Sequence, residues 1–128
     1  MTARLSEAML AGLPGDVARF GYDRSATQKG VVHLGIGAFH RAHQAAVFDT
    51  LLERDARWAV RAASLRSPAV RDTMMPQDGL YSLVVREGES EAVRVIGAVR
   101  NVLVAPEDPE ALVEALAAPE TRIVTLTV

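Results

Sequence analysis

The sequence has no cysteine in its 128 residues, and Lys29 is its only lysine. The lack of cysteine excludes disulfide bonds, thiolate zinc sites and a thiol nucleophile. The remaining basic residues are arginines that are scattered along the chain, and the formal net charge is −2. A nucleic-acid surface needs clustered Lys and Arg to displace counterions. We therefore expect no nucleic-acid partner.

Long hydrophobic runs are also missing. No segment approaches the roughly 18 apolar residues of a membrane-spanning helix. The N-terminal "MTARLSEAMLAGLPGD" is interrupted by Glu7, Gly12, Pro14 and Gly15, where a signal peptide would be continuously apolar. These features predict a soluble, cytoplasmic protein with no membrane partner. Its composition, 49% hydrophobic and 23% charged, is typical of one globular domain.

Strand-like and helical patterns alternate along the chain, which predicts an α/β fold. β-Branched runs bounded by glycine or polar residues indicate strands, and 3.6-residue periodicity indicates helices. The polar "GESE" between two strand-like runs favours a β-hairpin. In chain order, the predicted elements are a helix at 6–12, a strand at 31–35, a helix at 38–54, a strand at 57–65, a helix capped by Ser67 with Pro68 as its first residue, strands at 80–87 and 92–104, a helix at 108–118 and a strand at 121–128.

We divide the chain into an N-terminal helix and lead-in, residues 1–30, and a nucleotide-binding domain, residues 31–128. The last predicted strand continues to Val128 without a turn, a cap or a polar tail. We therefore expect the chain to be the N-terminal part of a longer protein.

The stretch "VVHLGIGAFHRAHQ" (31–44) places a G-x-G turn between a strand and a helix. In a dinucleotide-binding turn the first glycine, here Gly35, allows a tight exit from the strand, and the second, Gly37, lets the backbone approach a pyrophosphate. His40 stands where the usual pattern has a third glycine. Its side chain is expected to point away from the sheet, or else to hold the helix further from it. The G-x-G by itself suits a structural turn as well as a cofactor site.

The preference between NAD and NADP stays open on the residues alone. An NAD site usually carries an acid at the end of the second strand, which binds the ribose 2′-hydroxyl. Asp55 precedes that strand, and its end carries Arg66 and Ser67 instead. An arginine at this place is able to meet a 2′-phosphate.

Three histidines and one turn need separate interpretation. His40 and His43 have the i, i+3 spacing of a metal pair, but they lack cysteine and a well-placed acid. His33 alternates within a buried strand, and we interpret it as a hydrogen-bonded core residue. Gln77 and Asp78 are interpreted as shaping the turn before the hairpin. We expect no metal site.

"HLGIGAFHRAHQ" resembles the opening motif of the mannitol dehydrogenase and fructuronate reductase family, the polyol-specific long-chain dehydrogenases. "SLRSPAVRD", "PQDGLYSLV" and "IVTLTV" match that family in the same order. The resemblance implies a Rossmann-type dinucleotide-binding domain with an inserted β-hairpin, truncated before a helical C-terminal domain, and NAD(H) or less often NADP(H) as cofactor. By position, the cofactor-binding residues would be Gly35, Ile36, Gly37, Ala38, Phe39, His40, Arg41, Arg66, Ser67 and Thr127.

The resemblance also implies hydride transfer between the cofactor and a polyol or sugar acid, either mannitol/fructose or mannonate/fructuronate. In the family a lysine, an asparagine and a histidine of the helical C-terminal domain serve catalysis. We therefore expect no catalytic residue in this chain, and no activity of residues 1–128 alone. A non-catalytic NAD(P)-binding sensor or regulatory module is the alternative. Nothing in the sequence indicates an oligomeric state.

Overall fold

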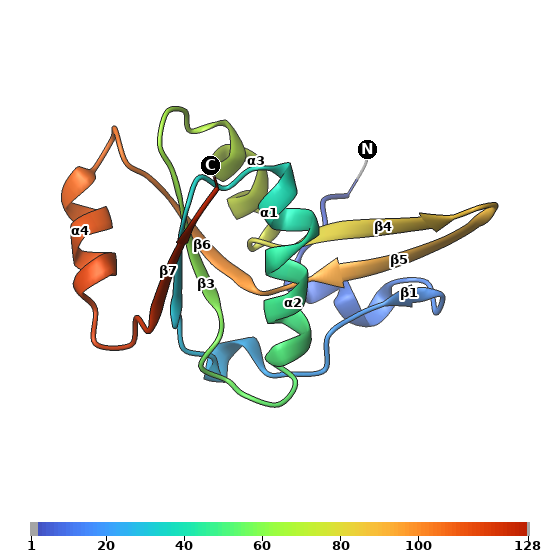
Figure 1. Cartoon of the computed structure of the whole chain (residues 1–128). Coiled ribbons are helices and arrows are strands. Elements are labelled where there is room, and N and C mark those ends of the chain that lie inside the picture. The colour runs from blue at the N-terminus through green and yellow to red at the C-terminus, as the bar shows by residue number, and fades with distance from the viewer. Residues whose placement is uncertain (1–2, 128) are drawn as a thin grey trace.

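A computed structural model describes residues 3–127. Its central element is a four-stranded parallel sheet with the strand order β6-β3-β2-β7 (Figure 1). The strands are β2 (Val31–Leu34), β3 (Val60–Ser64), β6 (Val99–Val104) and β7 (Ile123–Leu126). Val31 and Val32 of β2 and Ala62 and Ala63 of β3 are fully buried, as expected of inner strands of a parallel sheet.

The path of the chain through this sheet is that of a Rossmann fold. It starts at β2 in the sheet interior, moves outward through β3 to β6, and returns to place β7 on the other side of β2. The order therefore reverses between β2 and β7, and the crevice at the carboxyl ends of two such strands is where α/β sheets bind ligands. Helices α1 and α2 lie on one side of the sheet and α4 on the opposite side (Figure 1). The predicted α/β Rossmann-type fold is confirmed.

The helical segment after β2 is broken into α1 (Ala38–Ala42) and α2 (Gln44–Leu51). The backbone leaves regular helix geometry at His43, with φ −118° and ψ −74°. The prediction of one helix over 38–54 is therefore wrong at His43 and beyond Leu51. Apolar periodicity along the sequence does not reveal this break.

A second sheet is formed by the inserted hairpin. Strands β4 (Tyr81–Glu87) and β5 (Ser90–Ile96) pair in antiparallel register, and Gly88 takes the left-handed φ of +59° in the turn between them. The predicted hairpin is confirmed. The predicted single strand over 92–104 is wrong, because the chain passes from β5 to β6, and so from one sheet to the other, at Gly97–Ala98.

The N-terminal lead-in packs against the hairpin. Residues Glu7–Gly12 form a 3₁₀ helix, η1, where the sequence predicts a helix, and β1 (Val17–Ala18) pairs in parallel with β5. A further 3₁₀ turn, η2 (Arg24–Ala26), follows. The polar composition of the lead-in predicts neither this strand pairing nor the burial of Arg24.

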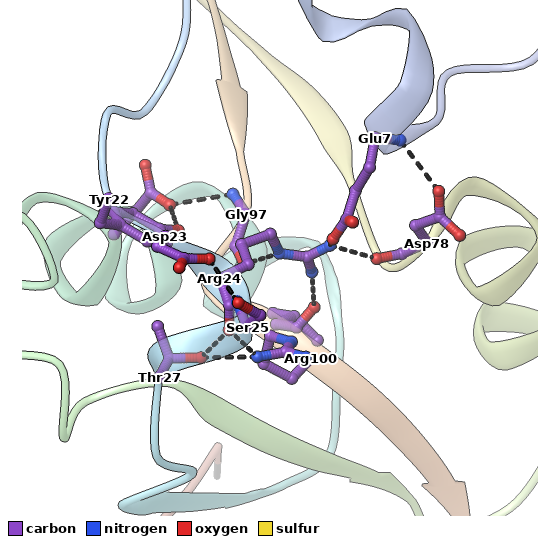
Figure 2. Close-up of polar contacts among 11 residues, drawn as sticks. Glu7, Tyr22, Asp23, Arg24, Ser25, Thr27, Asp78, Gly97 and Arg100 are labelled. Atoms are coloured by element: carbon purple, nitrogen blue, oxygen red, sulfur yellow. Dashed lines mark hydrogen bonds and ion pairs between the residues drawn. The ribbon is translucent and has the colours of Figure 1, made fainter.

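Arg24 joins the N-terminal segment to the place where the chain changes sheets (Figure 2). Its side chain, only 6% exposed, donates to the carbonyl oxygens of Gly97 at 2.9 Å, Val99 at 3.0 Å and Asp78 at 2.8 Å, and pairs with Glu7 at 2.5 Å. A buried guanidinium with its donors satisfied in this way ties distant segments together. The turn at Asp78, with φ +57°, is thereby held in place, which agrees with its predicted structural role.

The remaining elements keep close to their predicted places. Helix α3 (Ala69–Met74) starts one residue late: Pro68 is its N-cap, although the Ser67 hydroxyl still accepts from the Ala69 N–H at 3.1 Å. A 3₁₀ turn, η3 (Met75–Gln77), follows it. In α4 (Pro109–Ala117) the Asp108 carboxylate caps the helix by accepting from the Ala111 N–H at 3.1 Å, as predicted.

Strand β7 is shorter than the predicted 121–128, and the predicted end of that strand at Val128 lies outside the described residues. Within residues 3–127 none of the helices combines the length and the apolar character that crossing a bilayer requires.

Candidate functional site

The glycine turn lies at the carboxyl end of β2, beside the carboxyl end of β7. Gly35 adopts φ +98°, a conformation that residues with a Cβ rarely take. Its N–H donates to the Ala63 carbonyl at 2.8 Å, and its carbonyl accepts from the Gly37 N–H at 2.8 Å. The turn is thus tied to the neighbouring strand β3 and closed on itself. Ile36, 4% exposed, anchors it in the core.

This turn leaves backbone donors unused. In the part of the chain that the structure describes, the N–H groups of Ile36, Ala38 and Phe39 donate to no protein acceptor. A Cβ built on Gly37 would meet only the Gly35 carbonyl, at 4.0 Å, so the space in front of the turn is open. Free N–H groups beside open space suit an anion such as a diphosphate.

His40 points toward the sheet. Its side chain is 1% exposed, and its ring stacks on that of His33 with centroids 3.6 Å apart and an interplanar angle of 12°. Of the two alternatives for this residue, an outward-pointing side chain is therefore wrong. Burial, reinforced by the nearby His33 and opposed by Gln44, lowers the pKa of His40 to about 4.

His33 lies between the two strands of the crevice. Its Nδ1 is 2.7 Å from the Thr125 hydroxyl, and its Nε2 is 3.1 Å from both the Gly35 carbonyl and the Thr127 hydroxyl. The ring is 1% exposed, and burial lowers its pKa. The interpretation of His33 as a hydrogen-bonded core residue is confirmed.

The other residues predicted at the cofactor fall into two groups. Arg41 and Thr127 lie at the turn: the Arg41 Nε donates to the Gly37 carbonyl at 3.3 Å, and the Thr127 N–H donates to the Leu34 carbonyl at 3.4 Å. Arg66 and Ser67 are exposed and follow the carboxyl end of the adjacent strand β3. All four residues therefore lie at the end of the sheet where the carboxyl ends of the strands form the crevice.

Asp55 lies at the opposite end of β3. Its carboxylate accepts from the Arg57 guanidinium at 2.7 Å and from the Trp58 indole N–H at 2.9 Å, and the Arg57 hydrogen bonds lower its pKa. The carboxylate is thus engaged in a local turn.

The two histidines with metal-pair spacing do not converge. His40 lies against His33, whereas the His43 ring packs on Phe39 with centroids 4.5 Å apart. Across residues 3–127, no three or more His, Cys, Asp or Glu side chains come together in a way that could hold a metal ion.

A hollow of about 910 Å³ lies along α1 and α2 and reaches Phe39 at the start of α1. Its lining is mainly apolar and includes Phe39 and Val47, each 66% exposed, with Arg94 of β5 at its side. Because α/β sheets bind ligands at the carboxyl ends of their strands, we place the candidate site at the turn and not in this hollow.

Sequence reasoning missed two residues of the site, Thr125 and Gln44. The Thr125 hydroxyl contacts His33 and, at 2.8 Å, the amide of Gln44. The alternation of Thr125 and Thr127 on one strand was a usable signal. The register that sets His33 opposite Thr125 was not visible in the sequence.

Known proteins are similar to this chain in sequence and in fold. The family model described as "Mannitol dehydrogenase Rossmann domain" matches residues 29–128. The mannitol 2-dehydrogenase of Pyrenophora tritici-repentis is 41% identical over 84% of the chain, and that of Aspergillus niger is 39% identical over 99% of it. The chain spans only 20% and 27%, respectively, of the length of these relatives.

Two solved structures superpose closely. A substrate-free D-sorbitol dehydrogenase matches with a TM-score of 0.93, and a Pseudomonas fluorescens mannitol 2-dehydrogenase in ternary complex with NAD and D-mannitol matches with 0.91. Both are 36% identical to the chain and cover 98% of it, while the chain covers 27% and 26% of theirs.

Proposed function

The chain belongs to the mannitol dehydrogenase family, as its Rossmann domain, and from this membership we propose that it is the NAD-binding part of a polyol oxidoreductase. The observation that carries the proposal is the open turn at the β2–β7 crevice. The unused N–H groups of Ile36, Ala38 and Phe39 face the place where a diphosphate would bind. Arg41, at the same turn, adds a positive charge.

The cofactor, when bound, supplies or takes up the hydride. The residues of this chain would bind and orient it: the backbone of the turn would hold the diphosphate, and Thr127 at the end of β7 would lie near the nicotinamide. We place no catalytic residue in residues 1–128, and we expect this segment alone to turn over no polyol. Conversion of mannitol by purified residues 1–128 would contradict this expectation.

Mannitol and fructose are the substrate pair we propose for the whole protein, because the curated relatives are mannitol 2-dehydrogenases. Mannonate and fructuronate are the second pair to test, since the sequence motifs resemble both branches of the family. A cytoplasmic location stays a prediction from the sequence. The alternative of a non-catalytic sensor gains no support from the relatives, which are dehydrogenases.

The preference for NAD or NADP depends on the residues that follow β3. Arg66 and Ser67 are exposed there, and no carboxylate follows the strand. We propose NAD as the cofactor, in line with the neighbour that holds NAD, with appreciable binding of NADP because Arg66 is able to contact a 2′-phosphate. Titrating the whole protein with NADH and NADPH under the same conditions measures this ratio.

Gly37→Ala tests the cofactor turn. The new Cβ meets no protein atom closer than 4.0 Å, so folding is expected to be unaffected. The methyl group would occupy the space through which the backbone approaches the diphosphate, and we expect NADH affinity of the whole protein to fall at least about tenfold. Fluorescence titration with NADH measures this, and thermal unfolding checks the fold.

Gly15→Ala is the matched control, because the same substitution there also meets nothing within 4 Å. It lies in the lead-in, so NADH affinity should stay at the wild-type value. A Gly37→Ala protein that binds NADH as tightly as wild type would refute the proposed site.

A further inference from the structure

A buried polar cluster lies against the glycine turn, at the carboxyl ends of β2 and β7. His33 of β2 is at its centre, between the Gly35 carbonyl and the Thr125 hydroxyl of β7. Gln44, at the start of α2, lies on the far side of Thr125. Buried polar groups are nearly always hydrogen-bonded. The contacts of this cluster therefore determine which atoms carry its protons.

A hydrogen bond from His33 to the Gly35 carbonyl requires one tautomer of the ring. A carbonyl oxygen only accepts, so a hydrogen bond across the 3.1 Å between Nε2 and the Gly35 oxygen requires the ring proton on Nε2; the Thr127 hydroxyl, also 3.1 Å from Nε2, is then a second acceptor for that proton. The Nδ1 atom is then unprotonated and accepts from the Thr125 hydroxyl at 2.7 Å. That hydroxyl has a single proton, so this tautomer requires the Gln44 amide, whose Oε1 lies 2.8 Å from the Thr125 oxygen, to be turned over so that its NH₂ group faces the hydroxyl. The hydrogen bonds run in one direction, from α2 through β7 and β2 to the turn.

We propose that His33 is a positioning residue for cofactor binding and acts through the Gly35 carbonyl; the inference rests on the function proposed above. This carbonyl accepts two hydrogen bonds, one from His33 and one from the Gly37 N–H at 2.8 Å. Two donors on one oxygen fix the orientation of the peptide unit between Gly35 and Ile36.

The orientation of that peptide unit decides where the Ile36 N–H points. The peptide is planar and trans, so its C=O and N–H point in opposite directions. Because the Gly35 carbonyl is held toward the buried His33, the Ile36 N–H faces outward, where it finds no protein acceptor among the described residues. His33 thus prepares a donor for the diphosphate without touching the cofactor.

Loss of the His33 donor is therefore expected to affect NADH binding and kcat to different extents. Without the Nε2–H donor the peptide unit is free to rotate, and binding has to order it again. The diphosphate is remote from the carbon that exchanges hydride. Loss of the donor to the Gly35 carbonyl therefore raises the Kd and KM for NADH more than it changes kcat at saturating NADH, and an effect on kcat would act through the Thr127 hydroxyl, which also lies 3.1 Å from Nε2. A residue that served stability alone would produce no such split.

Two amide substitutions test the proposal in the whole protein. In His33→Gln the side-chain nitrogen can reach the place of Nε2, whereas in His33→Asn it reaches only the place of Nδ1. Both variants are uncharged and polar, so they differ mainly in the bond to Gly35. We expect the Kd for NADH to stay within about threefold of wild type in H33Q and to rise about tenfold in H33N, a larger change than that of kcat in the same variant.

The ring proton gives a readout that is independent of the cofactor. Long-range ¹H–¹⁵N spectra of the whole protein labelled at histidine should show His33 protonated at Nε2, the signal being assigned by its loss in H33Q. Thr125→Val removes the donor to Nδ1 and should weaken NADH binding about threefold. If thermal unfolding shows that H33N does not fold, the NADH affinity of T125V is compared with that of wild type instead.

Three results would each overturn the positioning role. The first is an equal NADH affinity of H33N and H33Q, and the second is a His33 ring protonated at Nδ1. The third, which applies if H33N does not fold, is an unchanged NADH affinity of T125V. A wild-type protein that binds no NADH would instead refute the proposed function. The two failures are distinguishable, because the tautomer is observed without NADH.

Discussion

His33 and His40 form a stacked pair of uncharged imidazoles under the glycine turn. The ring centroids are 3.6 Å apart, and each side chain is 1% exposed. Protonation of either ring would place a charge where water cannot reach it and beside a second ring. Burial accordingly lowers the pKa of both, that of His40 to about 4. At the scale of the residue, neutrality of this pair is a condition for the packing of α1 on β2.

The protein is expected to lose stability as the pH falls from 7 to 5. An unfolded histidine has a pKa near 6.5, whereas that of folded His40 is about 4. Between these values the unfolded chain binds a proton that folded His40 does not, so the free energy of unfolding decreases as the pH is lowered. The contribution of His40 between pH 7 and pH 5 is about 2 kcal/mol. Urea unfolding at both pH values measures it.

His40→Asn should make this pH dependence shallower, because the buried titrating ring is gone. His43→Asn is the control, since His43 lies three residues later, is exposed, and should leave the slope as in wild type. An H40N protein whose stability changes with pH as steeply as wild type would show that His40 does not carry the effect.

At the scale of elements, the passage from β5 to β6 places the hairpin beside the parallel sheet. Gly97 stands at this passage and is buried. Its N–H donates to the Asp49 carboxylate of α2 at 2.9 Å, and its carbonyl accepts from Arg24 at 2.9 Å. The N–H and C=O of Gly97 thus form hydrogen bonds with side chains of other elements and not with a neighbouring strand, which allows the chain to leave one sheet and enter the next.

Gly97→Ala is expected to destabilise the fold. A Cβ at this position would lie 2.4 Å from the ring of Phe20, so the ring or the strand has to move. Overpacking of this kind costs about 1–3 kcal/mol. The matched change Gly12→Ala meets nothing within 4 Å and should alter the free energy of unfolding by less than about 0.5 kcal/mol. Equal stabilities of the two variants in urea unfolding would contradict the prediction.

At the scale of the whole molecule, several apolar surfaces are exposed. Val124 and Leu126 of β7 are 49% and 59% exposed, and β7 stands at one end of the four-stranded sheet. Phe39 and Val47 expose 66% each beside the hollow along α1 and α2. Edge strands and large apolar patches of this kind favour association with other chains.

Residues 1–128 produced alone are therefore expected to self-associate in a concentration-dependent way, as measured by sedimentation velocity. Leu126→Glu places a charge on the edge strand and should reduce the association. Val113→Glu on α4 is the control, because Val113 is equally exposed, at 57%, but does not lie on an edge strand. A segment that is monomeric at all concentrations, or that responds equally to both changes, would show that the β7 edge is not the contact.

Local patterns were sufficient for most elements. The strands β2 and β3, the hairpin turn at Gly88 and the cap of α4 by Asp108 all follow from hydrophobic periodicity and turn chemistry. The G-x-G spacing located the turn, and the ordered motifs located the family. These features depend on residues close together in the chain, which is why one sequence reveals them.

What the sequence alone determined is thus the order of strands and helices, the glycine turn and the family. Only the tertiary structure decided that His40 turns inward onto His33, that His33 bonds the Gly35 carbonyl, and that the chain changes sheets at Gly97. Each of these depends on partners more than 40 residues away or on a neighbouring element, such as Thr125 for His33 and Asp49 for Gly97. Register across a sheet and the direction of a buried side chain arise from packing between elements. The periodicity of residues along one element therefore does not predict them.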